Sequence, residues 1–345
     1  MTAIDPKFNA MRGAVDMTHG AGGRAMADLI RDVFHRHLAN EYLAQGNDGA
    51  LLGKVAGRLV MATDAHVISP LFFPGGDIGA LAVHGTINDV AMMGARPLWL
   101  SASFVLEEGF PLATLDKIVA SMALAAREAG VPVVTGDTKV VERGKGDGVF
   151  ISTTGIGVLA DETTVSGSNA RPGNAILVSG TMGDHGVAIL SKRENLEFET
   201  EIVSDSQPLH DLVAAILAAA PDVRVLRDPT RGGLSATLNE IAHQSQVGML
   251  IREAVVPVKP EVAAACELLG LDPLNIANEG KLIAICNAAD ADALLATMRA
   301  HPKGQDAAII GEVVADERAL VRMHTRLGGM RVVDWIAGEQ LPRIC

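Results

Sequence analysis

The stretch LDKIVASMALAAREAGVPVVTGDTK, residues 115–139, predicts a helix, a strand and a charged turn in direct succession. Apolar residues recur at the i, i+3, i+4, i+7 spacing of a buried helix face, at Leu115, Ile118, Val119 and Met122. The helix is expected to end at Ala129 because Gly130 follows it. Residues 131–134 then predict a short strand leading into Gly136 and Asp137. This alternation is typical of an α/β-type domain.

The same alternation extends on both sides of this stretch. Further strands are predicted at 59–63, 99–106 and 149–159, and further helices at 25–38 and 78–93. The turn cluster NARPGN at 169–174 is the candidate boundary to a second half. There, helices are predicted near 185–192, 209–219, 234–246, 261–269 and 290–300, and strands near 175–179, 248–251, 281–287, 307–314 and 319–324.

This order predicts an α+β chain of two domains. We expect a loose leader at 1–16, an N-terminal domain at 17–165, a C-terminal domain at 166–330 and a tail at 331–345.

Composition excludes several function classes. The 345 residues are 48% hydrophobic and 20% charged, which is ample material for buried cores. A net charge of −12 argues against a general nucleic-acid surface. The N-terminus lacks a secretory signal pattern, and the longest strongly apolar run, 212–220, is too short to span a bilayer. We therefore expect a cytoplasmic protein that binds neither nucleic acid nor membrane.

The chain ends in a cysteine, Cys345, within GEQLPRIC at 338–345. From Trp335 onward an extended tail could reach roughly 35 Å, which suits a thiol carried between sites. The alternative is an incidental last residue, exposed or packed against the body. The two other cysteines, Cys266 in a predicted helix and Cys286 in a predicted strand, read as inert core thiols.

Acidic residues recur where apolar strands meet loops, at Asp64, Asp77, Asp89, Asp137 and Asp228. Carboxylates at strand ends can converge on one crevice, where they repel one another unless a divalent cation joins them. Mg²⁺ carrying nucleotide phosphates is the natural ion of this kind. Each aspartate taken singly could instead be a helix cap or a turn former.

Three glycine-rich or acid–base loops add to this pattern: HGAGGR at 19–24, GDTK at 136–139 and DPTRGGL at 228–234. Glycines let backbone amides approach a phosphate, and Arg24, Lys139 or Arg231 could add charge. None is a P-loop, and each could be a plain tight turn. Glu279, before an apolar strand, is either a surface turn residue or a general base.

Together these motifs resemble the HypE family of hydrogenase maturation proteins, within the superfamily of aminoimidazole ribonucleotide synthetase-like (PurM-like) ATP-dependent enzymes. The matching stretches are HGAGG at 19–23, PLFFPGGDIG at 70–79, GTINDVAMMGARP at 85–97, GDTKVV at 136–141, TTGIG at 153–157, GDHG at 183–186, DPTRGGL at 228–234, NEGK at 278–281 and PRIC at 342–345. The terminal PRIC is the part that separates this family from its relatives.

The resemblance implies a reaction. A carbamoyltransferase, HypF, places a carbamoyl group on Cys345, and the tail folds back. ATP with Mg²⁺ then activates the amide oxygen as a phosphate leaving group, which leaves a thiocyanate on the sulfur. Cyanide passes to iron on a HypC–HypD scaffold. The implied fold is PurM-like: the N-terminal α/β domains form a homodimer through their sheets, ATP lies between the N- and C-terminal domains, and the C-terminal tail is flexible.

The resemblance also implies residue roles. Cys345 would be the acceptor, Glu279 the base, and Lys139 a group that assists proton transfer or stabilises developing charge. From the residues themselves, Arg343 would lower the pKa of the Cys345 thiol and the adjacent terminal carboxylate would raise it, so the state of the thiol stays open. Nucleotide contacts would come from His19, Gly20, Gly22, Gly23, Asp64, Asp77, Asn88, Asp89, Asp137, Thr138 and Arg231. Mg²⁺ would be held by Asp64, Asp89, Asp137 and Asp228.

Three alternatives stay open at this point. A selenophosphate synthetase would need a reactive cysteine or selenocysteine near the N-terminus, and residues 1–40 contain no cysteine. A thiamine phosphate kinase would have no use for a terminal thiol. A nucleotide-responsive scaffold would use its tail only to dock a partner.

Overall fold

The computed structural model describes residues 13–160, 163–196, 200–335 and 343–345. Residues 1–12 of the predicted leader and residues 336–342 of the predicted tail therefore lie outside the described residues. Within the described part of the chain, no helix is long and apolar enough to cross a membrane.

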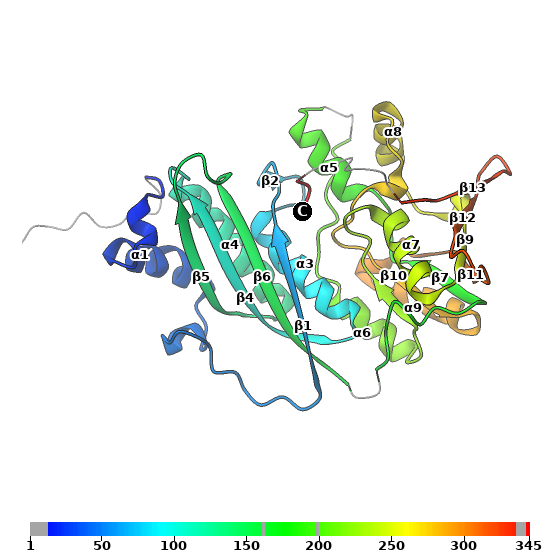
Figure 1. Cartoon of the computed structure of the whole chain (residues 1–345), viewed down its shortest axis with the longest axis horizontal. Coiled ribbons are helices and arrows are strands. Elements are labelled where there is room, and N and C mark those ends of the chain that lie inside the picture. The colour runs from blue at the N-terminus through cyan, green and yellow to red at the C-terminus, as the bar shows by residue number, and fades with distance from the viewer. Residues whose placement is uncertain (1–12, 161–162, 197–199, 336–342) are drawn as a thin grey trace, which may run out of the picture.

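The first domain is a four-stranded sheet with helices on one face (Figure 1). Its strands are ordered β1-β6-β4-β5, with bounds β1 Arg58–His66, β4 Arg96–Glu107, β5 Val133–Val141 and β6 Val149–Leu159. Helix α3 (Ile78–Met92) packs on β1, β6 and β4, and helix α4 (Leu112–Ala129) packs against α3. The other face of the sheet has no covering layer of described residues, and Leu59 and Met61 on it are 67% and 72% exposed.

Two glycines bring α3 close to the sheet. A Cβ atom at Gly157 would lie 2.4 Å from Cγ1 of Val90, and one at Gly155 would lie 2.9 Å from Cγ2 of Thr86. Both distances are too short for real contacts, so no side chain fits at either position. This explains the TTGIG pattern at 153–157, where every second residue faces the helix.

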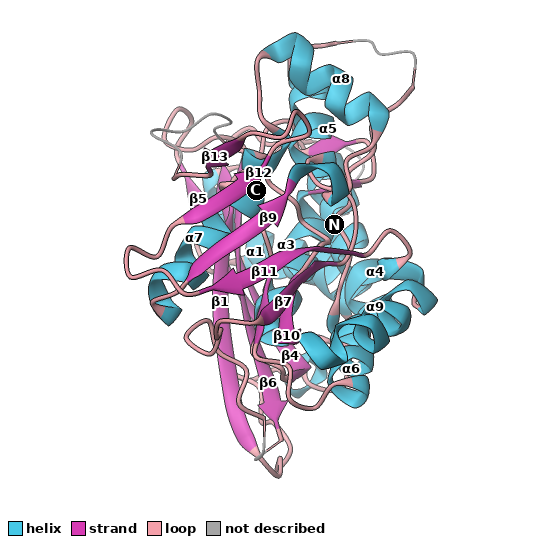
Figure 2. Cartoon of the chain, turned by 90° about the vertical axis from the view of Figure 1, so that its right-hand side faces the viewer, coloured by secondary structure: helices cyan, strands magenta, loops and turns pink. Residues whose placement is uncertain are grey.

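A second, seven-stranded sheet forms the C-terminal domain (Figure 2). Its order is β13-β12-β9-β11-β7-β10-β8, with bounds β7 Asn174–Val178, β8 Val225–Arg227, β9 Gly248–Arg252, β10 Ile283–Asn287, β11 Ala308–Val314, β12 Val321–His324 and β13 Met330–Val332. Helices α6 (His210–Ala219) and α9 (Ala291–Ala300) pack on one face, and α7 (Gly233–Ser245) packs on the other. Helices α5 (Asp184–Arg193) and α8 (Pro260–Leu269) lie together at one end.

Most predicted elements are confirmed, with shifts of one to three residues at their ends. The N-terminal helix runs from Arg24 to Leu38 as α1 (Arg24–Leu29), a π-helical turn and α2 (Arg36–Leu38). The strand predicted at 131–134 is wrong in extent, because β5 continues through Asp137 to Val141. Asp64 likewise lies within β1 and not after it. Strands β8 and β13, and the short hairpin β2 (Phe72–Phe73) with β3 (Gly76–Asp77), were not predicted.

The two internal cysteines are core residues, as expected. Cys266 and Cys286 are each 1% exposed, and burial raises the pKa of both thiols to about 11.

We expect Gly157→Ala to destabilise the protein by about 1–3 kcal/mol, since the new methyl group must push α3 off the sheet. Gly49→Ala is the matched control, because a Cβ there meets nothing within 4 Å. Chemical denaturation of both variants measures the difference. Equal free energies of unfolding would contradict the close approach of α3 to β6.

Candidate active site at the docked C-terminus

The last three residues of the chain lie against the body, between the two domains (Figure 1). They continue the line of β1 as an antiparallel partner, with Ile68 bridged to Ile344. The Val67 N–H donates to an oxygen of the Cys345 terminal carboxylate at 3.0 Å, and the Ser69 N–H donates to the Arg343 carbonyl at 3.2 Å. This described end of the predicted flexible tail is therefore held by main-chain hydrogen bonds.

Two side chains of α5 complete the attachment of the tail. Nε2 of His185 lies 2.7 Å from the Ile344 carbonyl, and its Nδ1 lies 2.8 Å from the Ser204 hydroxyl. Because a carbonyl only accepts, Nε2 carries the proton in this contact. Arg193 donates to the carbonyls of Ser69 and Arg343, at 2.8 and 2.7 Å. His185 is fully buried, and burial lowers its pKa, which keeps the ring neutral.

The sulfur of Cys345 faces Arg231 and Glu279. A guanidinium N–H of Arg231 points at Sγ at 3.6 Å. Burial and the Glu279 carboxylate raise the pKa of the thiol to about 12, and Arg231 opposes this only in part. Arg343, one of the two opposing influences on the thiol pKa, forms an ion pair with Asp147. In the docked position the cysteine is thus a protonated thiol.

Glu279 is a buried acid, not a surface turn residue. It is 4% exposed, and within the described structure its Oε1 has no hydrogen-bond partner. Its N–H donates to Asp205, and Gly280 follows it where a Cβ would meet the Asp205 carbonyl at 1.8 Å. Burial, with the nearby carboxylates Asp228 and Asp205, raises the pKa of Glu279 well above its usual range. A carboxyl group kept ready in this way suits proton transfer.

Three of the five predicted aspartates converge on Glu279. Asp64 comes from β1, Asp89 from α3 and Asp228 from the loop after β8, so both domains contribute. Burial, then Asp228 and Asp64, raise the pKa of Asp89 to about 7, and burial raises that of Asp228 to about 6. Among the residues that the structure describes, no group of three or more His, Cys, Asp or Glu side chains is arranged so that it could hold a metal ion by itself. The carboxylates of the cluster raise one another's pKa values, and a cation bound beside them would reduce this repulsion.

Asp137 and Lys139 are not part of this cluster within one protomer. They pair with each other at 2.9 Å on β5, which lies three strands from β1 and so roughly 14 Å away. They also occupy the opposite face of the sheet. Thr138, between them, is 5% exposed on the helix-covered face, where Asp64 approaches Gly85 of α3. The expectation of one acidic site including Asp137 is thus not met within a single chain.

The glycine loop lies beside the same strand as Asp137. A Cβ at Gly20 would meet Cβ of Val140 at 2.9 Å, whereas Gly22 and Gly23 face open space. His19 is 6% exposed, and its Nδ1 accepts the Asp16 N–H at 3.0 Å, so it closes a local turn. After the buried His19, the loop from Gly20 to Arg24 is exposed, and only Gly20 has no room for a side chain.

Two residues predicted to contact the nucleotide, Asp77 and Asn88, form hydrogen bonds to the protein backbone. Asp77 caps α3 by accepting the N–H groups of Gly79 and Ala80, the alternative that the sequence left open. Asn88 is 1% exposed. Its side-chain amide N–H group donates to the carbonyls of residues 207 and 279, and its side-chain oxygen accepts the N–H of residue 209. It therefore ties α3 to the backbone of Glu279.

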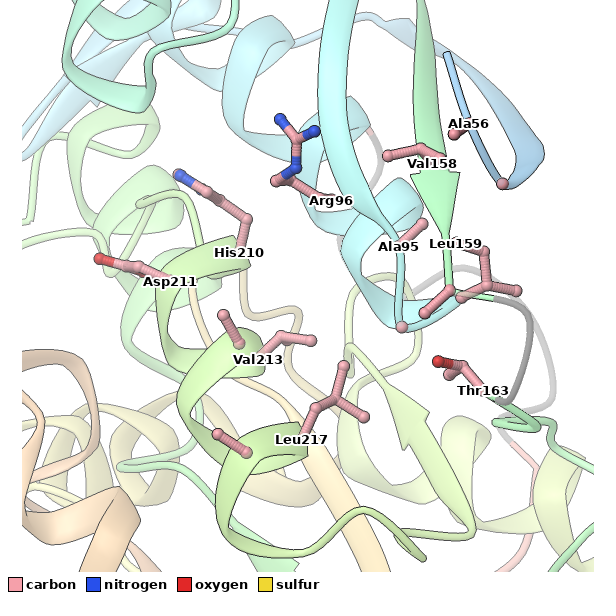
Figure 3. A pocket seen from close by; sticks show the side chains of 15 residues that line it. Ala56, Ala95, Arg96, Val158, Leu159, Thr163, His210, Asp211, Val213 and Leu217 are labelled. Carbon is pink, nitrogen blue, oxygen red and sulfur yellow. The ribbon is translucent and has the colours of Figure 1, made fainter.

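The residues that hold the tail were not predicted from sequence motifs. His185 lies in the GDHG stretch, to which the sequence assigned no role, and Arg193 and Asp205 lie in no recognised motif. A separate groove of about 750 Å³ lies between α6 and the ends of β4 and β6 (Figure 3). Its wall is mostly apolar, with Arg96, His210 and Asp211 at one side, and it contains none of the predicted site residues.

Two family matches cover most of the chain. Residues 46–159 match "AIR synthase related protein, N-terminal domain", and residues 171–324 match "AIR synthase related protein, C-terminal domain". The chain is 70% identical over 339 residues to "Carbamoyl dehydratase HypE" of Cupriavidus necator, covering 98% of this chain and 97% of that relative. It is 48% identical over 336 residues to the Escherichia coli protein of that name, covering 96% and 99%.

Solved structures agree with these relatives. "Hydrogenase Maturation Protein HypE in complex with ATP" superposes with a TM-score of 0.92 at 52% identity, covering 95% of this chain and 99% of that one. The "HypE-HypF complex" contains a chain with a TM-score of 0.79 at 50% identity, covering 89% and 99%. A thiamine-monophosphate kinase from Stenotrophomonas maltophilia reaches a TM-score of 0.63 at 23% identity, covering 86% and 95%, and shares the fold alone. The chain is therefore a member of the HypE family of carbamoyl dehydratases, on a two-domain α+β fold of the AIR synthase related type.

Proposed function

We propose that this protein dehydrates a carbamoyl group on its own C-terminal cysteine, using ATP, and so supplies cyanide for hydrogenase maturation. The observation that carries this function is the docked Cys345, whose sulfur lies beside Arg231 and the buried Glu279. A last residue without a function would not need to be held in this position by residues 67–69, His185 and Arg193, which form the seat of the tail. A docking scaffold would not need an unpartnered buried carboxyl group at the same place.

The reaction balances as follows. The carbamoylated sulfur and ATP give a thiocyanate, ADP and phosphate. The amide oxygen attacks the γ-phosphoryl group, the C–O bond then breaks with phosphate as leaving group, and both N–H protons are lost. Glu279 accepts a proton from nitrogen, since it is a buried carboxyl group whose charge acts on the Cys345 thiol. Arg231 stabilises negative charge that develops on the oxygen or on the phosphate.

The open carboxylate cluster fits Mg²⁺ carried by ATP. Mg²⁺ is held in such sites by one or two carboxylates together with substrate phosphates, not by a protein cage. Asp64, Asp89 and Asp228 would hold it, and it would neutralise the phosphates during transfer. The raised pKa values of Asp89 and Asp228 fit this role, because a bound cation would favour their charged forms.

Carbamoylation itself must happen elsewhere. A docked thiol with a pKa of about 12 is a poor nucleophile, so the tail has to leave the body to meet its carbamoyl donor. We assign this step to a HypF-type carbamoyltransferase and the later acceptance of cyanide to a HypC–HypD iron scaffold. We infer that both steps take place in the cytoplasm, and the free acceptor thiol and the use of ATP support this inference.

Glu279→Gln should leave the tail carbamoylated and slow its dehydration by about 10²–10⁴-fold, the usual contribution of a general base. The wild-type rate should rise with pH through the raised pKa of Glu279, because only the ionised form accepts a proton. Mass analysis of the C-terminal peptide at several pH values measures both effects. Glu279→Gln protein that forms thiocyanate at the normal rate would show that another group is the base.

The protein also forms a homodimer in this proposal, through the uncovered face of the β1-β6-β4-β5 sheet. Leu59 and Met61 are mostly exposed there, and a two-layer domain normally buries such a face. Asp137 and Lys139 lie on the same face. They can therefore assist the reaction only at the tail of the partner subunit.

Mixed dimers test this arrangement. Cys345→Ala and Lys139→Ala proteins should each be inactive alone, the first without losing ATP binding. Mixed and allowed to exchange subunits, they should regain about a quarter of the wild-type activity, since half the dimers are mixed and each has one complete site. A thiocyanate assay on mixtures measures this. Mixtures that stay inactive although exchange is complete would show that Lys139 serves its own chain.

A further inference from the structure

The described end of the tail is held mainly through its main chain. Of the contacts made by Arg343, Ile344 and Cys345, most go to main-chain oxygens. Pairing of an extended segment with a strand edge, with a buried side chain for specificity, is one recurring way in which proteins bind peptides. The seat is thus built as a peptide-binding groove.

Ile344 supplies the side-chain specificity. It is 5% exposed and belongs to the core of the N-terminal domain, which also includes Ile68, Phe73 and Ile189. Phe73 in turn contacts the His185 ring edge-on, with ring centres 5.6 Å apart. The residue before the cysteine must therefore be apolar, whereas the Arg343 side chain is exposed and forms an ion pair with Asp147.

We propose that the site also accepts the tail as a separate peptide, and dehydrates an S-carbamoylated peptide that ends in Arg-Ile-Cys. The substrate class is a short peptide with a free terminal carboxylate, an apolar residue before the cysteine, and a carbamoyl group on its sulfur. The inference rests on the proposed function, and it adds that covalent attachment of the tail is not required for catalysis.

The chemistry is that of the attached tail. The peptide thiocarbamate and ATP give a peptide thiocyanate, ADP and phosphate, with loss of two protons from nitrogen and transfer of the amide oxygen to phosphate. Attachment mainly raises the local concentration of the tail, to the millimolar range for a short tether. A peptide supplied at millimolar concentration replaces that contribution.

Arg193 and His185 are positioning residues in this account. Their hydrogen bonds to the described end of the tail go to the carbonyls of Arg343 and Ile344 and not to the sulfur. Loss of Arg193 should therefore weaken binding of a separate peptide and leave the rate at saturation nearly intact. With the attached tail, the high local concentration hides much of this effect.

The test uses full-length Ile344→Asp, Cys345→Ser protein, whose own tail carries a charge that the apolar seat rejects and has no sulfur to modify. It is incubated with ATP, Mg²⁺ and the peptide GEQLPRIC, carbamoylated at sulfur, and the peptide mass is followed. Loss of one water, dependent on ATP, is expected. A peptide with aspartate in place of the isoleucine should react at least about tenfold more slowly, because seating it buries a charge.

Two controls separate the possible failures. Wild-type protein carrying its own carbamoylated tail is assayed in parallel, so that inactivity there overturns the proposed function itself. The peptide inference alone is overturned if the wild-type protein dehydrates its attached tail but the double variant leaves the peptide mass unchanged. In that case the double variant must still bind ATP and unfold at the wild-type temperature. Adding Arg193→Ala should raise KM for the peptide with little change in kcat, whereas Lys192→Ala, one residue earlier on α5, should change neither. Equal loss of kcat with Arg193→Ala would contradict its positioning role.

Discussion

The pairing of the chain's last three residues with residues 67–69 is the constraint on which the rest of the site depends. It fixes the position of the sulfur by main-chain hydrogen bonds, which depend little on the side chains of the tail. It also joins the two domains, because the strand edge belongs to the first and His185 and Arg193 belong to the second. Glu279 and Arg231 can then meet one sulfur atom from a rigid frame, as catalysis by positioning requires.

The same seat separates the two halves of the reaction cycle. Burial that suits dehydration makes the thiol a poor nucleophile, so capture of the carbamoyl group and its dehydration cannot share one position. The carboxylates around Glu279 also raise one another's pKa values. Asp64, Asp89 and Asp228 repel one another in the absence of a cation, and in the proposed mechanism ATP carrying Mg²⁺ would relieve that repulsion.

The sequence was a good guide wherever a local pattern carried the information. The helix face from Leu115 to Met122 and the strand at 149–159 follow from their periodicity, and Asp64, Asp89, Asp228 and Glu279 converge as their motifs indicated. Asp137 and Lys139 could not be assigned, because a shift of one residue along a strand changes the face of the sheet. Asp77 was a helix cap, a role that a lone aspartate shares with many others. The attachment of the tail by His185 and Arg193 depends on long-range contacts that no local pattern records.

The most direct measurement is the intact mass of the C-terminal peptide after carbamoylation by the partner transferase, before and after the addition of ATP and Mg²⁺. We expect one carbamoyl group on Cys345, followed by the loss of one water that occurs only when ATP is supplied. Active hydrolysis of ATP beside an unmodified Cys345 would contradict it, and would direct the search to a small-molecule phosphate acceptor.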